Sequence, residues 1–113
     1  MILALPYPPS INHYWRVVRG RPIKSKEGRE YTSKVQLLAK QAMGFGAQPL
    51  QGPVKVVVSV YRPRRIGDLD NTLKVLLDAL RGIVYEDDSQ IVHIDATRND
   101  DAANPRAVIE VRQ

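Results

Sequence analysis

The chain has 113 residues, enough for one domain with a modest hydrophobic core, and we expect residues 1–113 to form that single domain. It contains no cysteine, which excludes a disulfide scaffold and any zinc site built from cysteine. The net charge is +5, divided into +10 over residues 1–65 and −5 over residues 66–113. Such a division suits a basic half that binds a polyanion and an acidic half that binds a cation, although a chance imbalance in a small protein is the alternative.

The N-terminal quarter is predicted to contain one strand followed by a long loop. Residues 1–5 are apolar, without a basic lead, and too few for a signal peptide or a membrane anchor, so we expect a strand in a cytoplasmic protein that does not bind membranes. Prolines exclude a helix over residues 6–10. Residues 11–26 are polar, aromatic and basic, and they are interrupted by Gly20 and Pro22. This composition predicts a long loop, and long loops in compact domains are usually functional or disordered.

A helix is predicted over about residues 26–43. Its apolar positions recur at spacings of three and four, which places them in one stripe: Tyr31, Val35, Leu38, Ala42 and Phe45. Ser25 is a suitable N-cap residue, and Gly44 and Gly46 are suitable terminators.

The second half is predicted to contain three strands and one helix. Residues 54–61 are rich in valine and predict a buried strand, and a basic loop follows at residues 62–67. A helix over residues 71–80 would bury its four leucines, and residues 85–89 form an acidic turn. Residues 90–98 and 106–112 alternate between apolar and polar residues, which predicts two strands joined as an antiparallel hairpin. The order β-α-β-α-β-β predicts an α+β or mixed α/β fold, with a mixed sheet packed on two helices.

Asp68 and Asp70 form the most informative pair of residues in the sequence. In an extended segment, residues two apart point to the same side, so these carboxylates can converge. Two carboxylates held close together repel each other unless a cation lies between them, and Mg²⁺ or Mn²⁺ prefers such oxygen ligands. The alternative is structural: Asp70 caps the following helix and Asp68 belongs to a turn.

Three nearby features favour the metal site. Lys74 lies one helical turn after Asp70 and could hold a phosphate, whereas its alternative is a surface ion pair with Asp70 or Asp78. Asp87 and Asp88 precede a predicted strand, where the alternative is a solvated acidic turn. Acids, a lysine and an arginine-rich loop together are typical of phosphodiester hydrolysis.

Cations and aromatic residues in the two predicted loops are candidates for nucleic-acid binding. Cations can contact phosphates, and aromatic rings can stack on exposed bases. Alternatively, Tyr14 and Trp15 close the edge of the core, while His13 and His93 are expected to be surface or strand residues rather than ligands. The candidate DNA-binding residues are Asn12, Tyr14, Arg16, Arg19, Arg21, Lys24, Lys26, Arg62, Arg64 and Arg65.

Several motifs occur in one order along nearly the whole chain: PYPPSINHY at 6–14, SKEGREY at 25–31, DLDN at 68–71 with Lys74 and DAL at 78–80, and DDSQI at 87–91. Together they resemble the RusA family of crossover junction endodeoxyribonucleases. The resemblance implies a Mg²⁺-dependent homodimer, with Mn²⁺ as a substitute and no organic cofactor, that resolves Holliday junctions in branched DNA by paired nicks during bacterial or phage recombination. It also implies that Asp68, Asp70 and Asp88 are catalytic metal ligands and Lys74 the catalytic lysine, with Asp87 ranked behind Asp88.

Two other functions remain open from the residues alone. One is a nucleic-acid-binding module without catalysis, whose acids serve only as caps and turns. The other is a metal-dependent nuclease or phosphatase that acts on other substrates. Metal-dependent cutting would exclude the first, and a preference for four-way over linear DNA would exclude the second.

Overall fold

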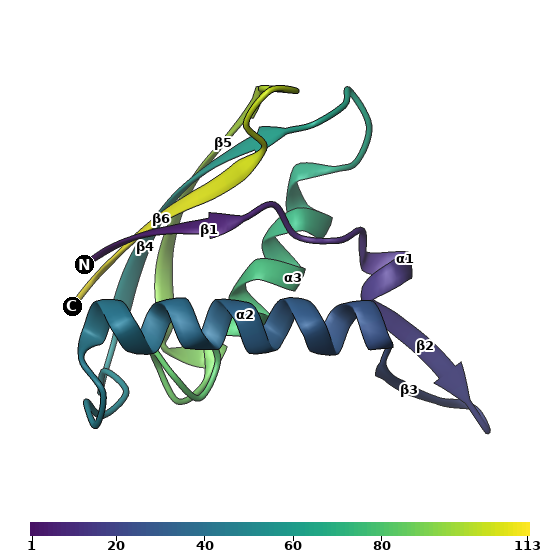
Figure 1. Ribbon diagram of the computed structural model, residues 1–113. Helices are drawn as coiled ribbons and strands as arrows, with labels where there is room; N and C mark the ends of the chain where they lie inside the picture. Colours follow the sequence, from purple (N-terminus) through teal and green to yellow (C-terminus); the bar gives the residue numbers. More distant parts are fainter.

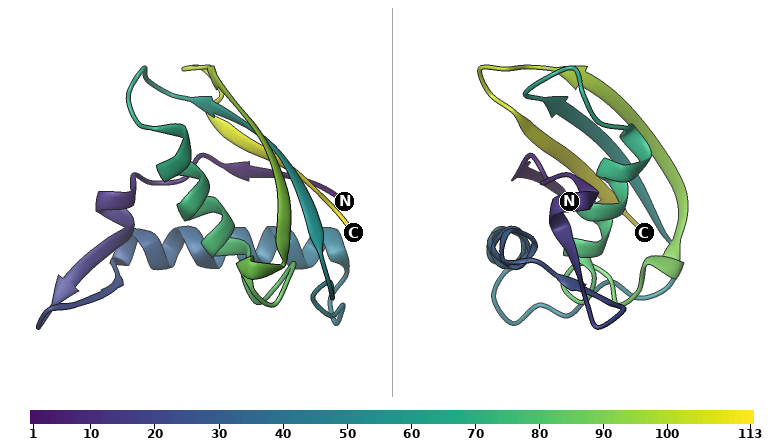
Figure 2. Two further views of the ribbon diagram at one scale, coloured as in Figure 1. Left: turned by 180° about the vertical axis from the view of Figure 1, so that it is seen from behind. Right: turned by 90° about the vertical axis from the view of Figure 1, so that its right-hand side faces the viewer.

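The computed structural model describes residues 1–113 and contains a four-stranded mixed sheet in the order β1-β6-β4-β5. The strands are β1 (Ile2–Pro6), β4 (Val54–Arg62), β5 (Ile91–Asp100) and β6 (Arg106–Arg112). Helices α2 (Lys26–Met43) and α3 (Leu69–Leu80) both lie on one side of this sheet (Figures 1 and 2). The predicted mixed sheet on two helices is therefore confirmed.

Helix α2 begins and ends at the predicted residues because its local signals are strong. The Ser25 hydroxyl accepts a hydrogen bond of 3.0 Å from the Gly28 amide, and Gly44 ends the helix with a positive φ of 94°. The predicted apolar stripe is wrong beyond Leu38, because Ala42 is exposed and Phe45 is 73% exposed. Phe45 follows the terminating glycine, so it no longer shares the helix's periodicity.

The sheet and α3 supply most of the core. Valines at alternate positions of β4 are buried in the middle of the sheet, as the sequence predicted: Val54, Val56, Val58 and Val60. Helix α3 begins two residues earlier than predicted and buries Leu76, Leu77 and Leu80, while Leu73 is half-buried. No helix in the structure is both long and apolar enough to cross a lipid bilayer.

The predicted hairpin between residues 90–98 and 106–112 is wrong. Strand β4 lies between β5 and β6, pairing with β5 in parallel and with β6 in antiparallel orientation. The unit β4-α3-β5 is a crossover, which places β5 parallel to β4 at the edge of the sheet. As an edge strand, β5 leaves Val92 and Ile94 exposed, whereas the alternating residues Ala107, Ile109 and Val111 of β6 are buried.

The predicted long loop at residues 11–26 is also wrong. It contains a short helix α1 (Ile11–Tyr14) and a two-stranded hairpin, β2 (Trp15–Val18) and β3 (Arg21–Lys24), which projects from the body of the molecule (Figures 1 and 2). Positive φ angles at Arg19 (52°) and Gly20 (75°) form its tight turn. Isolated hairpins are marginally stable in water, so this one depends on its attachment to the core.

Tyr14 fixes the base of this hairpin. Its buried side chain donates a hydrogen bond of 2.6 Å to Asp78 Oδ2 on α3 and lies 3.0 Å from Thr32 Oγ1 on α2. Its carbonyl oxygen accepts a 2.9 Å hydrogen bond from the Ser25 amide. A Cβ at Gly28 would lie only 2.3 Å from this oxygen, so a glycine is needed at that position. The fold thus holds the base rigidly and leaves the hairpin itself exposed.

Candidate active site

Asp68 and Asp70 lie at the N-terminal end of α3 and are both exposed. Asp68 is extended and occupies the N-cap position, whereas Asp70 is already in the first helical turn, so the predicted fully extended pair is wrong. Asp68 makes no capping hydrogen bond, and its carboxylate accepts only a 3.5 Å contact from Asn71 Nδ2. Neither acid takes part in any ion pair. Two exposed carboxylates without a cation beside them suit a hard divalent ion that keeps several of its waters.

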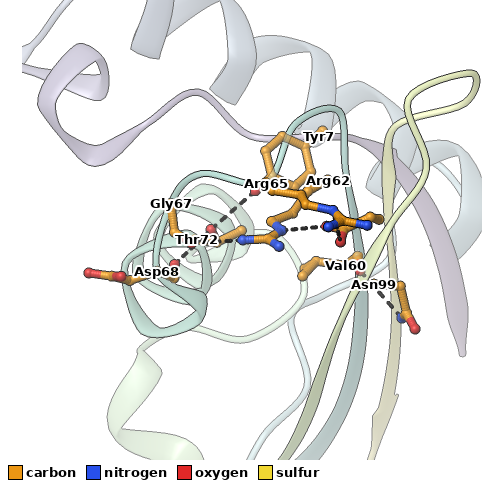
Figure 3. Close-up of polar contacts among 9 residues, drawn as sticks. Tyr7, Val60, Arg62, Arg65, Gly67, Asp68, Thr72 and Asn99 are labelled. Carbon is orange, nitrogen blue, oxygen red and sulfur yellow. Dashed lines mark hydrogen bonds and ion pairs between the residues drawn. The ribbon is translucent and has the colours of Figure 1, made fainter.

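The backbone around Asp68 is held from both sides. The Thr72 amide and hydroxyl donate to the Asp68 carbonyl at 3.1 and 3.0 Å, and the guanidinium of Arg62 donates to the preceding carbonyl of Gly67 at 3.4 Å. Figure 3 shows the side chain of Asp68 pointing away from this cluster. These contacts fix the backbone while the carboxylate itself stays free.

Arg62 is not on the surface of the predicted basic loop. It is only 8% exposed, and its Nε donates a 2.7 Å hydrogen bond to Asp100 Oδ1 on the neighbouring strand. This hydrogen bond and the charge of Arg62 hold the pKa of Asp100 below its usual range. Arg62 therefore braces the loop that leads to Asp68, whereas Arg64 and Arg65 are exposed.

Lys74 lies on α3 one turn after Asp70 and is exposed. It forms no ion pair with Asp70 or Asp78; the partner of Asp78 is Lys24, at 3.7 Å. Its ammonium group is therefore free to bind an anion at the N-terminal end of the helix.

At the other end of α3, the two acids of the DDSQ motif differ from each other. They begin a 3₁₀ turn, η1 (Asp88–Gln90), in which Asp87 forms a capping box with Gln90. Asp87 also accepts a 2.8 Å hydrogen bond from the Ser89 hydroxyl and pairs with Arg81 Nε at 3.3 Å. The Ser89 hydroxyl, assisted by Arg81, holds the pKa of Asp87 below its usual range. Asp88 is exposed and has no ion pair, so it is the free acid at this end.

A single chain does not bring these acids together. The ion pair of Asp87 with Arg81, the C-cap residue of α3, places the DDSQ motif at the C-terminal end of the helix. With 12 residues, α3 holds its ends about 18 Å apart. No group of three acidic or histidine side chains is arranged to hold a metal ion. This separation could have been predicted from the sequence, since the predicted helix lies between Asp70 and Asp88.

The candidate DNA-binding residues near the N-terminus divide into exposed and engaged side chains. Asn12, Arg16, Arg19 and Arg21 are exposed. Lys26 forms a surface pair with Glu30 at 3.9 Å. Lys24 is engaged with Asp78, and its ammonium lies 5.8 Å from the centre of the Tyr14 ring.

The aromatic and histidine candidates also have separate places. Tyr14 belongs to the core, whereas Trp15 packs edge-on against it and is partly exposed. Both histidines are exposed, His13 on α1 and His93 on β5.

The sequence reasoning missed Asp78 and Asp100 as supporting residues. Asp78 lies on α3 and binds Tyr14 and Lys24, which are far away in sequence. Asp100 meets Arg62 only because β4 and β5 pair in parallel. Neighbouring residues in the sequence do not indicate either contact. An acid on a leucine-rich helix was nevertheless a sign that Asp78 has a partner in the fold.

Comparison with known proteins gives a consistent result. A family model described as "Endodeoxyribonuclease RusA" matches residues 6–112. A relative named "Crossover junction endodeoxyribonuclease RusA" from Escherichia coli strain K12 is 42% identical over 93 residues, covering 80% of this chain and 75% of the relative. The protein of the same name from Shigella sonnei strain Ss046 has the same identity and coverage. The rusA protein of Enterobacteria phage 82 is 41% identical over 93 residues, with coverage of 80% and 75%.

Proposed function

The chain belongs to the RusA endodeoxyribonuclease family, as its motifs predicted, and from this premise we propose that it is a divalent-metal-dependent homodimer that resolves four-way DNA junctions by paired nicks. The relatives come from bacteria and from a phage, so the proposed setting is recombining DNA in the bacterial cytoplasm. We propose that the chain acts as a single nuclease domain.

The separation of the acids along α3 carries the proposal of a dimer. A Mg²⁺ ion binds oxygen at about 2.0–2.1 Å, and paired catalytic ions lie about 3.5–4 Å apart. Neither arrangement can span the roughly 18 Å between the ends of α3. This separation supports a site that combines Asp68 and Asp70 of one subunit with Asp88 of the partner subunit.

The chain's own residues have separate roles in this site. Asp68 and Asp70 would hold the ion, preferably Mg²⁺ with Mn²⁺ as a substitute, and Asp88 of the partner subunit would complete the ligands. When bound, the ion supplies positive charge that activates water and stabilises the transferring phosphate. Lys74 holds a non-bridging oxygen of the same phosphate and offsets its charge. We rank Asp87 below Asp88 as a ligand because its carboxylate is already bound by Ser89 and Arg81.

Two exposed basic regions provide the DNA-binding surface in this proposal. The hairpin carries Arg16, Arg19 and Arg21, and residues 11–26 contain no acid. Arg64 and Arg65 lie in the loop directly before Asp68. Such cations bind phosphates without reading sequence, which suits recognition of a junction by its shape.

A two-fold symmetric dimer explains why nicks would come in pairs. A four-way junction has near two-fold symmetry, and its resolution requires cuts in two strands of like polarity. A C₂ dimer, the commonest homo-oligomer, presents two sites related by the same symmetry.

Mixing two inactive variants tests this proposal. Asp70→Asn and Asp88→Asn homodimers should both be inactive on a synthetic four-way junction in Mg²⁺. In a mixed dimer one site collects both substitutions and the other collects none, so mixing should restore single nicks. If each site is built within one chain, mixing restores nothing, and the shared site is wrong. Equal cutting of linear duplex DNA, or cutting that persists in EDTA, would contradict the proposed activity itself.

A further inference from the structure

A groove of about 890 Å³ lies directly beside Asp68. One wall is the segment of residues 6–11, the second is the first part of α2, and the third is the loop of residues 63–68 with the first turn of α3. Figure 1 shows how the chain after β1 crosses toward α1 between the two helices. Asp68 belongs to the lining, so the groove begins where the proposed metal site begins.

Hydrogen bonds fix the walls of the groove relative to one another. Tyr31 of α2 donates a 2.8 Å hydrogen bond to the Pro6 carbonyl, which joins the first two walls. Tyr7 Oη lies 3.5 Å from Thr72 Oγ1, which joins the first wall to α3, and Figure 3 shows Tyr7 beside the loop that precedes Asp68. A groove formed in advance binds without the cost of ordering its walls.

The chemistry of the lining fits a nucleobase better than a phosphate. Much of it is formed by the rings of two tyrosines and five prolines: Tyr7, Tyr31, Pro6, Pro8, Pro9, Pro63 and Pro105. Three carboxylates lie in the lining, those of Glu27, Glu30 and Asp68, and they outnumber its two cations, Lys34 and Arg64, so the groove is not the strongly basic site that a phosphate needs. A base presents apolar faces to the rings, and its amino groups can donate to the carboxylates.

We infer that this groove binds an unpaired nucleobase of the DNA strand next to the scissile phosphate; the inference rests on the proposed function, which places that phosphate at Asp68. The volume falls within the range of sites that bind small molecules, so it suits a single base. Extruding a base costs least where it is already unpaired or poorly stacked, as at a branch point. The groove therefore favours branched DNA over continuous duplex.

Junctions that lack single bases test this inference by binding alone. Four-way junctions carrying one abasic residue at each position near the branch point are titrated with wild-type protein in EDTA, with fluorescence anisotropy as the readout. One position should lose about tenfold in affinity, since the base that stacks on these rings is missing there. An abasic residue far along a duplex arm should have no effect. Tight binding that no abasic position weakens overturns the groove and leaves the proposed function standing, whereas absence of junction binding overturns the proposed function.

A groove-filling variant sharpens the test. Ser10 lines the groove and its side chain makes no capping hydrogen bond, so Ser10→Leu narrows the groove without removing a contact. Compared with wild type, this variant should bind the intact junction about tenfold more weakly. On the junction whose abasic residue already weakens wild-type binding, the variant and the wild type should have the same affinity. Ser33→Leu, at an exposed position of α2 outside the groove, is the matched control and should behave as wild type. If the affinity losses caused by Ser10→Leu and by the abasic residue multiply when the two are combined, the two changes act at different places and the inference is wrong.

A second variant distinguishes a base from a phosphate in the groove. Glu27→Gln removes one carboxylate from the lining without breaking an ion pair, whereas Glu30 pairs with Lys26, a candidate DNA-binding residue. If the groove holds a base, affinity for the intact junction stays equal or falls, and the abasic effect remains. If the groove holds a phosphate, affinity rises because repulsion is relieved, and the inference is wrong. The wild-type abasic series decides the question even if a variant fails to fold.

Discussion

At the N-terminal end of α3, Asp68 and Asp70 are exposed acids whose only polar side-chain contact is one of 3.5 Å from Asn71. At the C-terminal end, Asp87 is bound by Ser89, by Arg81 and by a capping box, and only its neighbour Asp88 is free. The difference shows that proximity in sequence does not assign a role to an acid. An acid whose carboxylate is hydrogen-bonded and ion-paired within the chain stabilises the fold. An acid whose carboxylate lacks such partners is available to bind a ligand.

Asp70→Asn should have the largest effect at the N-terminal end. Loss of a metal ligand should lower cutting about a thousandfold or more. Junction binding without metal should stay the same or tighten, because a charge that repels phosphate is removed. Cutting rates and anisotropy measure the two quantities. Equal loss of both in a folded variant would mean that Asp70 is structural.

Substitutions of Asp87 and Asp88, the two acids at the C-terminal end of α3, should have different effects. Asp88→Asn should lower cutting about a hundredfold or more and leave the melting temperature unchanged. Asp87→Asn should lower the melting temperature slightly, since it removes the charge that pairs with Arg81 and weakens the hydrogen bond from Ser89, and should affect cutting less. Thermal melts and cutting rates of both variants check the comparison. It fails if Asp87→Asn abolishes cutting while melting like wild type.

Asp100→Asn tests whether the Arg62–Asp100 pair, by holding the loop before Asp68, contributes to metal binding. The substitution removes the charged partner of Arg62, which holds the Gly67 carbonyl, and the 3.8 Å ion pair with Arg65 of the same loop. It should weaken Mg²⁺ binding about tenfold by calorimetry. Asp101→Asn is the matched control, because the side chain of the next residue, Asp101, pairs with Arg106 at 3.0 Å and not with Arg62. The 2.8 Å hydrogen bond from the Asp101 amide to the Arg62 carbonyl is a backbone contact that this substitution keeps. Equal effects of the two variants would indicate a general loss of loop stability.

The pH dependence of stability provides a separate measure of the Arg62–Asp100 pair. Because Arg62 lowers the pKa of Asp100 in the folded state, the pair stabilises the protein above the unfolded pKa of about 3.9. That contribution is lost as the pH falls through the lower, folded pKa. The melting temperatures of wild type and Asp100→Asn should therefore differ at neutral pH and converge in acid. A constant difference at all pH values would exclude the ion pair as its cause.

The smallest expected effect is on the salt dependence of DNA binding. Replacing Arg64 and Arg65 by alanine should flatten the slope of log affinity against log salt by about 0.9 for each phosphate that these arginines neutralise. Titrations at several salt concentrations without metal give the slope. An unchanged slope would place both arginines off the DNA.

Local signals in the sequence predicted local structure well. Ser25 and Gly44 fix the ends of α2, and the valines of β4 identify a buried strand. The hairpin at residues 15–24 was missed although Gly20, after the apolar pair Val17-Val18, is suited to a tight turn. The position of β4 between β5 and β6 could not be predicted, because alternation shows that a strand has two faces and not which strand pairs with it.

The candidate site was predicted in its residue types but not in its arrangement. Motif spacing identified Asp68, Asp70 and Asp88, yet it did not state that α3 keeps them apart. The supporting pair of Arg62 and Asp100 depends on a parallel register between strands, which no spacing along the chain encodes. The groove joins three segments distant in sequence and is likewise visible only in the folded chain.

The strand order has a consequence for how the protein is made. β1 leaves the ribosome before the other strands, but its partner in the sheet is β6, the final strand in sequence order. β6 also pairs with β4, so the sheet lacks an inner strand until translation has passed residue 112. A nascent or truncated chain can form helices but cannot close its core, because such long-range pairing forms late. Translation that stops before residue 106 therefore leaves β1 and β4 without the strand that joins them.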